Sequence, residues 1–254
     1  MSMCSSGDPA NIGCGNCGII PHSTWDEVPS PVLETLAQRK TIRTIPKGSF
    51  LFHQGGACEA LYRLLSGVVL LKKGDHDGNS LVVQMVRKGA TIGYRAFLRN
   101  EAHCVSAYCA TDVVVCHIPS RVARWAFEQN HRLEQAFAAN LASDLDQTEN
   151  QILNILGLTV RDRVLVLLAQ MAEEFGSRDG DGMRIETPLL RTDMAAMLGI
   201  ARESMSRCIR AVEEEGLLEF RRESVYAPSW ERFEAAIAAI TQDMPQARVA
   251  SRCR

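Results

Sequence analysis

RTDMAAMLGIARESMSRCIRAVEEEG, residues 191–216, contains two helical patterns separated by a glycine. RTDMAAMLG predicts a short first helix, and IARESMSRCIRAVEEEG predicts a longer second one. The turn between them, at 198–200, includes Gly199, which can adopt the positive φ that a tight turn needs. Apolar residues at helical spacing would pack the two helices together: Met194, Ala195, Leu198, Ile200, Met205 and Ile209. The segment therefore predicts a helix-turn-helix.

The first turns of the second helix carry polar side chains on one face. They are Arg202, Glu203, Ser206 and Arg207, at positions i, i+1, i+4 and i+5. The N-terminal part of a recognition helix meets base edges in the major groove, where arginine can hold a guanine and glutamate can accept from cytosine. Gly216 ends the helix, and LLEFRRESVYAP after it predicts two short strands, a wing. We therefore expect this region to bind double-stranded DNA.

Charge alone does not distinguish this segment from a charged helix on the surface of an ordinary helical domain. Residues 199–212 contain three Arg and one Glu, a local charge of +2, and three glutamates follow at 213–215. The glycine turn, the apolar spacing, the polar face and the wing together favour DNA binding.

Residues 41–119 alternate short apolar or β-branched runs with glycine and proline. The runs are TIRTIPKGSFLFHQG, ALYRLLSGVVLLKKG, NSLVVQMVRKGATIG and SAYCATDVVVCHIP. Asp77-Gly78 between two of them is a hairpin signal. Short strands with evenly spaced turns predict an antiparallel barrel or sandwich. The predicted fold class is therefore α+β, with an N-terminal antiparallel β-domain and a C-terminal winged helix-turn-helix.

Residues 121–158 lack proline and repeat apolar residues every three or four positions. The stripe consists of Leu133, Phe137, Leu141, Leu145, Thr148, Ile152 and Ile155. A stripe this narrow is typical of a coiled-coil seam and predicts a homodimer. The alternative is a helix that lies on its own β-domain. Polar residues on the remaining faces favour the dimer: Asn140, Asp144, Asp146 and Glu149.

Composition limits the function classes. The 254-residue chain has a formal net charge of −2, so any nucleic-acid surface must be local. The longest apolar run is too short to cross a membrane, and the N-terminus lacks the basic and apolar regions of a secretory signal. We therefore expect a cytoplasmic protein with no membrane partner.

Nine cysteines are many for a cytoplasmic chain. In a reducing compartment such residues more often bind metals or take part in redox chemistry than form structural disulfides. Cys14 and Cys17 form a Cys-x-x-Cys motif in an irregular N-terminal arm. Cys109 in a predicted strand and Cys208 in a predicted helix are expected to be small buried hydrophobic residues.

A glycine-punctuated barrel, a long helix and a winged helix, in this order, resemble the CRP/FNR family of transcription regulators. The resemblance implies an α+β fold with an N-terminal antiparallel β-roll (a cupin-like jelly-roll barrel), a long dimerisation helix and a C-terminal winged helix-turn-helix. The resemblance covers residues 32–228, and its strongest motif is GIARESMSRCIRAVEEEGLL. It implies that the four polar residues of the second helix contact bases or phosphates, and that RNA polymerase is a partner. The Glu-x-x-Ser-Arg pattern is that of the oxygen-responsive FNR branch, which implies a palindromic TTGAT-like site.

These patterns divide the chain into four parts. They are a cysteine-containing arm (1–31), a β-roll sensor domain (32–120), a dimerisation helix (121–158) and a winged-helix DNA-binding domain with a C-terminal tail (159–254). A regulator is expected and not an enzyme, because no thioredoxin-like βαβ pattern surrounds the Cys-x-x-Cys and no hydrolase motif appears.

The resemblance also implies an iron–sulfur cofactor. FNR proteins carry an N-terminal Cys-x-x-Cys and a further cysteine just before Ile-Pro, which match Cys14, Cys17 and Cys116. In that branch these thiolates hold a [4Fe–4S] cluster, which takes four cysteine ligands. The competing interpretations are a reversible disulfide between Cys14 and Cys17, a haem or small-molecule sensor in the roll, and a thiol redox enzyme.

The fourth ligand is left open by a departure from the family pattern. Where FNR proteins have a third N-terminal cysteine, this chain has Ser23. Cys4 is the expected substitute because a ten-residue span can loop back to Cys14. His22 is the alternative, since imidazole replaces thiolate in some iron–sulfur sites. Cys104 or Cys109 is the third alternative for this ligand.

A cyclic nucleotide is not expected. Cyclic-AMP binders of this family carry Gly-Glu for the ribose hydroxyl and Arg-Ser for the phosphate, whereas this chain has Gly93-Tyr94 and Val105-Ser106 there. Arg95 is near but not in the matching position. A buried phosphate without its arginine would lose its charge-assisted partner.

Overall fold

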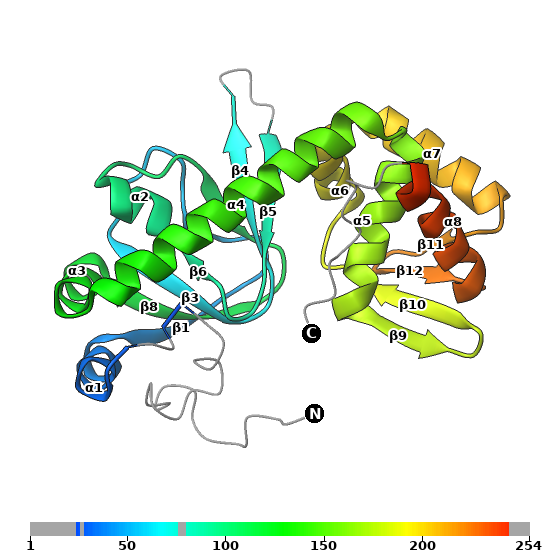
Figure 1. Cartoon of the computed structure of the whole chain (residues 1–254). Coiled ribbons are helices and arrows are strands. Elements are labelled where there is room, and N and C mark those ends of the chain that lie inside the picture. Colours follow the sequence, from blue (N-terminus) through cyan, green and yellow to red (C-terminus); the bar gives the residue numbers. More distant parts are fainter. Residues whose placement is uncertain (1–23, 26–27, 76–79, 244–254) are drawn as a thin grey trace. The chain divides into compact units, whose positions relative to one another are not determined.

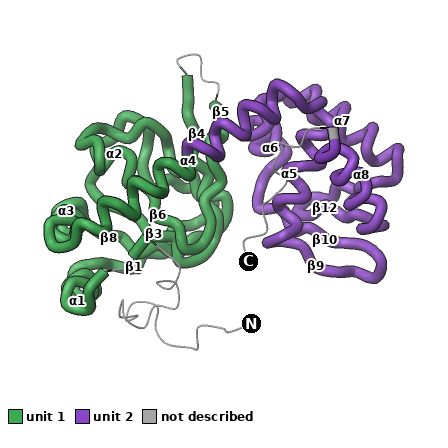
Figure 2. The backbone as a smooth tube through the Cα atoms, viewed as in Figure 1, with its two compact units in different colours: residues 1–144 green, residues 145–254 purple. Residues whose placement is uncertain are grey.

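The computed structural model describes residues 24–25, 28–75 and 80–243 (Figure 1). It divides the chain into two compact units, residues 1–144 and 145–254 (Figure 2). The described residues of the first unit form a β-roll with helices, and those of the second form a helical domain with a small sheet. The predicted α+β fold class is confirmed.

The roll consists of two four-stranded antiparallel sheets. The first has the order β1 (Thr41–Ile45), β8 (Val113–Pro119), β3 (Ala60–Ser66), β6 (Thr91–Ile92), and the second β2 (Phe50–Phe52), β7 (Ser106–Cys109), β4 (Val69–Gly74), β5 (Ser80–Val86). β4 pairs antiparallel with β5, as a hairpin requires, with a register shift between Leu71 and Lys72 and with Gly74 opposite Ser80. The turn itself lies outside the described residues.

Two apolar layers stabilise this unit. One strand can contribute to both layers, because successive strand residues point to opposite faces of the sheet. On β8, Val113 and Val115 face the inner layer between the two sheets, whereas Cys116 and Ile118 face an outer layer. The outer layer includes side chains of α1 (Ser30–Arg39), α2 (Tyr94–Arg99) and α3 (Ser120–Gln129), the helices of the roll that Figure 1 labels. The alternation thus separates two sets of side chains that lie on one strand.

The prediction of one continuous helix over 121–158 is wrong at its N-terminal end. α3 ends at Gln129, and α4 (His131–Gly157) begins after Asn130, whose backbone is extended with φ −151°. The Asn130 side chain accepts a hydrogen bond from the Arg132 N–H at 3.1 Å, which satisfies an end group of the new helix. An N-capping residue therefore interrupts a segment that has no proline.

The apolar stripe of α4 also has two parts. Leu133 and Phe137 belong to the outer layer of the roll, so their predicted place in a dimer seam is wrong, and the alternative of a helix on its own roll is confirmed for this half. The later apolar residues are exposed: Leu141, Leu145, Ile152, Leu153 and Leu156. The same helix therefore changes from a covered to an uncovered apolar face.

The second unit is built on α5 (Val160–Phe175), whose buried side chains form much of its core. Its remaining elements are β9 (Gly176–Asp179), β10 (Gly182–Glu186), α6 (Arg191–Leu198), α7 (Arg202–Glu214), β11 (Glu219–Phe220), β12 (Ser224–Ala227) and α8 (Trp230–Asp243). The sheet has the order β11-β12-β10-β9 and is antiparallel. The predicted wing is therefore part of a larger sheet, and the helix α8 follows it.

We predict that Phe137→Ala lowers the free energy of unfolding by about 3–5 kcal/mol, because the ring is fully buried and its loss leaves a cavity. Urea unfolding followed by tryptophan fluorescence measures this. Phe50→Ala is the matched control, since the Phe50 side chain is 41% exposed. Equal effects of the two substitutions would contradict the placement of Phe137 in the core.

Candidate nucleic-acid interface and sensor face

The predicted helix-turn-helix is confirmed. α6 ends at Gly199, which has φ +64°, and the backbone N–H groups of Gly199 and Ile200 both bond to the Ala195 carbonyl. This left-handed residue closes α6 and redirects the chain, a conformation that glycine adopts without strain. α7 then begins at Arg202.

α7 has one buried and one exposed face. Met205, Cys208, Ile209 and Val212 are buried, which confirms the expectation for the Cys208 thiol. The four predicted contact residues are all exposed: Arg202, Glu203, Ser206 and Arg207. The helix therefore presents the polar groups that could meet base edges and phosphates.

Two further residues of α7 were not singled out in the sequence. Arg210 is exposed one turn after Ser206 and Arg207, and extends the polar face. Ser204 accepts a hydrogen bond from Arg207 Nη2 at 3.2 Å, which can orient the guanidinium. The i, i+3 spacing of the Ser204–Arg207 pair is a signal that was available in the sequence.

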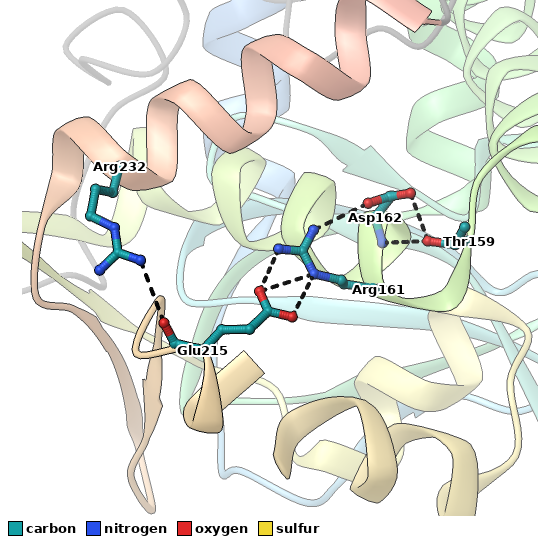
Figure 3. Close-up of polar contacts among 5 residues, drawn as sticks. All are labelled: Thr159, Arg161, Asp162, Glu215 and Arg232. Atoms are coloured by element: carbon teal, nitrogen blue, oxygen red, sulfur yellow. Dashed lines mark hydrogen bonds and ion pairs between the residues drawn. The ribbon is translucent and has the colours of Figure 1, made fainter. Parts of the chain in front are cut away.

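An ion pair holds the C-terminal end of α7 (Figure 3). Arg161 of α5 donates to the Glu215 carboxylate, with the shortest contact 2.6 Å from Nη2 to Oε2, and also contacts Asp162. Arg232 of α8 donates to the Glu215 carbonyl at 3.5 Å. The hydrogen bond from Arg161 lowers the pKa of Glu215 from its ordinary value. Glu215 thus joins α7 to both α5 and α8.

The wing is tied to both helices of the motif. The Phe220 N–H donates to the Glu213 carboxylate at 3.0 Å, and Arg191 Nη2 donates to the Phe220 carbonyl at 3.2 Å. Glu213, at the end of α7, therefore connects that helix to β11. In the sequence the glutamates at 213–215 count only toward the local charge, whereas the structure gives Glu213 and Glu215 positioning roles.

The turn of the motif is also attached to the last residues of α4. Gln151 Nε2 donates to the Met197 carbonyl at 2.9 Å, and Arg163 donates to the carbonyls of Leu158 and Leu198 at 3.2 and 3.0 Å. These bonds satisfy carbonyl groups at two helix ends, where intrahelical partners are missing. The end of α4 and the motif therefore form one hydrogen-bonded assembly.

On the roll, Cys116 is buried in the outer layer and not in the inner layer between the two sheets. In the strand register Cys116 lies opposite Arg63, and Arg63 lies opposite Thr91, so the three residues form a row across β8, β3 and β6. Each of them is buried. Trp25 covers this region, and its indole N–H donates to Thr91 Oγ1 at 3.0 Å.

The segment that carries Trp25 also contacts α4. Asn140 Nδ2 donates to Thr24 Oγ1 at 2.7 Å, and the rings of Trp25 and Phe137 meet edge to face at 5.7 Å. Residues 24–25 therefore lie between the outer face of the roll and the first half of α4. This contact could not be found in the sequence, because its partners are more than a hundred residues apart.

Most of the predicted cluster ligands lie outside the described residues: Cys4, Cys14, Cys17 and the alternative His22. Within the described ranges, no group of three or more His, Cys, Asp or Glu residues could hold a metal ion. Cys109 is buried in the inner layer, as expected, and burial raises its pKa to about 11, which makes it a poor ligand for a site on the outer face. Cys58 packs against the outer layer and was missed; burial raises its pKa also.

The residues at the positions where cyclic-AMP binders hold the nucleotide make other contacts in this chain. Tyr94 begins α2, its ring lies 5.4 Å from that of Phe137, and both Tyr94 and Arg95 bond to Asp144 of α4. Val105 is buried in the inner layer. In the part of the chain that the structure covers, no helix is long and apolar enough to cross a membrane.

A β-roll joined through a long helix to a helix-turn-helix with an exposed polar face defines a DNA-binding regulator. Two family models agree: the cyclic nucleotide-binding domain matches residues 42–130, and the Crp-like helix-turn-helix domain matches residues 162–236. The chain belongs to the CRP/FNR family of transcription regulators. Members of this family bind DNA, act with RNA polymerase as dimers and are not enzymes.

Individual relatives are distant. The chain is 28% identical over 193 residues to the cAMP-activated global transcriptional regulator CRP of Pasteurella multocida. This match covers 74% of this chain and 90% of that protein. It is 25% identical over 197 residues to the anaerobic regulatory protein of Bacillus subtilis, and the match covers 77% of this chain and 83% of that protein. The c-di-GMP-responsive regulator CLP of Xanthomonas campestris has the same fold, with a TM-score of 0.69, 20% identity and coverage of 78% and 99%.

We predict that Glu215→Gln lowers the free energy of unfolding at pH 7 by no more than about 1 kcal/mol. The Arg161 and Glu215 side chains are 38% and 42% exposed, so solvent screens the pair. Because folding lowers the Glu215 pKa, its contribution is complete above the unfolded pKa and disappears as the pH falls through the folded pKa. Urea unfolding at a series of pH values from 7 downward should show a difference between wild type and variant that is largest at pH 7 and shrinks toward acid pH. Glu214→Gln, exposed on the same turn, is the control.

Proposed function

We propose that the chain is a cytoplasmic homodimeric regulator that binds a palindromic TTGAT-like site and acts with RNA polymerase. We further propose that it senses oxygen or redox state through a [4Fe–4S] cluster held by Cys4, Cys14, Cys17 and Cys116. The observation that carries the DNA-binding part is the exposed polar face of α7 on a buttressed helix-turn-helix. The position of Cys116 carries the sensing part.

At the DNA, Arg202, Glu203, Ser206 and Arg207 are the proposed contacts. Their exposure at the start of α7 supports this role, because that end of a recognition helix enters the major groove. The ties from Glu213 and Glu215 to neighbouring elements hold the helix at its other end. Fixed geometry matters, since bidentate contacts to a base depend on orientation.

Dimerisation is proposed through the exposed stripe of α4 at residues 141–156. Leu145 is 59% and Leu156 79% exposed, which is costly for large apolar side chains on a helix unless a partner covers them. A second copy of the same helix is the proposed partner, because the stripe has the narrow spacing of a coiled-coil seam. A palindromic site would match the two-fold symmetry of such a dimer.

The position of Cys116 on the outer face of the roll suits a cluster ligand that joins the N-terminal arm to the roll. Its side chain lies in the layer that Trp25 covers, and Trp25 follows Cys17 by eight residues. Eight residues can span at most roughly 26–29 Å, so the Cys-x-x-Cys can lie against this face. Arg63 lies opposite Cys116 and would place a positive charge beside the thiolate ligands. This would favour the thiolates, because a buried negative charge is stable when it has a positive partner. A cluster bound there would supply oxygen-sensitive redox chemistry.

The contacts of residues 24–25 suggest how the arm acts on α4. An arm held at its cysteines keeps Trp25 against Thr91 and Phe137, and keeps Thr24 bonded to Asn140. Release of the arm would loosen these contacts along the first half of α4, next to the residues proposed for the dimer. The signal then travels through packed side chains and one helix.

We also propose that the roll binds no cyclic nucleotide, although its domain model is named for that ligand. Val105 contributes an apolar side chain where cyclic-AMP binders place an arginine. Arg95, the nearest arginine in the sequence, bonds to Asp144 on α4. A phosphate in the interior would therefore lack its cationic partner unless Arg95 left Asp144.

We predict that Arg207→Ala and Glu203→Ala each remove specific DNA binding and leave the fold intact, because both side chains are exposed. Each lost base contact should cost about 1–3 kcal/mol, or about ten-fold to a hundred-fold in affinity. Titration of a TTGAT palindrome and a scrambled duplex by fluorescence anisotropy measures this. Arg184→Ala, on β10, is the matched control. Wild-type affinity in both α7 variants would show that the recognition face is wrongly assigned.

We predict that Cys116→Ser loses the iron as completely as Cys14→Ser. Cys208→Ser and Cys109→Ser should retain it, because their thiols lie in α7 and in the inner layer of the roll. Iron and sulfide are counted after purification without oxygen. Cys4→Ser and His22→Ala, compared in the same way, identify the fourth ligand. Full iron in Cys116→Ser would overturn the bridging site.

A further inference from the structure

Three side chains of the roll converge on one carboxylate of α4. Gln84 Nε2 donates to Asp144 Oδ1 at 2.9 Å, and Arg95 donates to Oδ2 from Nη2 at 2.8 Å and from Nε at 3.3 Å. The Tyr94 hydroxyl donates to the same Oδ2. We call this group, Gln84, Tyr94, Arg95 and Asp144, the Asp144 clamp. It joins β5 and the first residues of α2 to α4.

The clamp is shielded from water. The side chains of Arg95 and Asp144 are only 29% and 13% exposed, which makes the pair stronger than the ordinary surface ion pair. Burial and the neighbouring carboxylate raise the pKa of Tyr94, so its hydroxyl stays protonated and donates. Asp144 thus has donors on both carboxylate oxygens, and its charge is compensated by Arg95.

The position of Asp144 along α4 is what makes the clamp significant. Asp144 follows Leu141 by three residues and precedes Thr148 by four, and these spacings place side chains next to each other on a helix. Leu141 and Leu145 begin the exposed stripe, and Phe137 ends the covered one. The carboxylate therefore lies at the border between the face that packs on the roll and the face that is proposed to meet a second copy.

We propose that the Asp144 clamp is a positioning device for dimerisation: it holds a carboxylate against the roll that would otherwise stand beside the dimer seam. This inference rests on the proposed dimer. In a two-fold dimer every residue near the axis meets its own copy, so two free carboxylates would repel each other and would lie against apolar side chains. Arg95 is then required because Asp144 is charged, and not because α2 needs the contact for folding.

This proposal predicts an asymmetry between the two partners. Arg95→Gln leaves an uncompensated carboxylate at the border of the seam, so it should weaken the dimer strongly. Asp144→Asn removes the charge itself and keeps an acceptor for Gln84, so it should weaken the dimer little. The double variant should behave like Asp144→Asn alone, because without the carboxylate there is nothing for Arg95 to compensate. A purely structural contact would give similar losses in both single variants.

The test is sedimentation equilibrium of the full chain, purified without oxygen, with circular dichroism as the check of folding. For Arg95→Gln we expect the dimer dissociation constant to rise about ten-fold or more, the range of a lost charge-assisted hydrogen bond. Asp144→Asn and the double variant should stay within about three-fold of wild type. The controls are Asp146→Asn, the same substitution on an exposed residue of α4, and Arg99→Gln, on an exposed residue of α2.

Three outcomes would overturn the proposal. Dimer constants for Arg95→Gln that match those of Arg99→Gln would show that the clamp does not affect association. A double variant as weak as Arg95→Gln, or weaker, would show a structural contact without the charge effect. A wild-type chain that sediments as a monomer would overturn the proposed dimer itself, and the clamp with it. If Arg95→Gln does not fold, Tyr94→Phe removes a different donor, and its loss of dimer should likewise be rescued by Asp144→Asn.

Discussion

The helix α4 has two different apolar faces along one axis, and the outer layer of the roll depends on the first of them. Leu133 and Phe137 complete the outer layer of the roll, and Leu141 and Leu145 lie a short rotation away, uncovered. A helix advances about 100° per residue, so apolar residues spaced four apart move gradually around the helix, from the face that packs on the roll to the uncovered face. The polar residues Asn140 and Asp144 mark this border, and each is hydrogen-bonded to the roll unit.

In the second unit, the recognition helix is held largely through polar groups at helix ends. Apolar packing beneath α7 fixes its buried face, but packing alone allows small rotations and shifts. Arg161 and Arg232 bind Glu215 at the end of α7, and Gln151 and Arg163 bind carbonyls at the end of α6. Directional bonds at the turn and at the C-terminal end of the motif specify its orientation, which is what contacts to base edges require.

On the sensor side, the period-two alternation of β-strands separates thiols that are close in sequence. Cys109 and Cys116 lie on neighbouring segments of one chain, yet Cys109 faces the inner layer and Cys116 the outer one. Only the outer face is covered by Trp25, which continues from the cysteine-containing arm. The geometry therefore distinguishes a candidate ligand from a core residue by the face of the sheet.

The sequence by itself determined the fold class, the helix-turn-helix and its exposed face, because these depend on local signals: apolar periodicity, a glycine at a tight turn and a polar helical face. It also identified Cys208 and Cys109 as buried. The tertiary structure alone decided that the stripe of α4 is shared between two faces, and that Asn130 interrupts the helix before it. It alone brought Thr24 to Asn140, Arg95 to Asp144 and Arg161 to Glu215. The physical reason is that periodicity records how apolar a face is, whereas the partner that covers the face comes from residues far away in the chain.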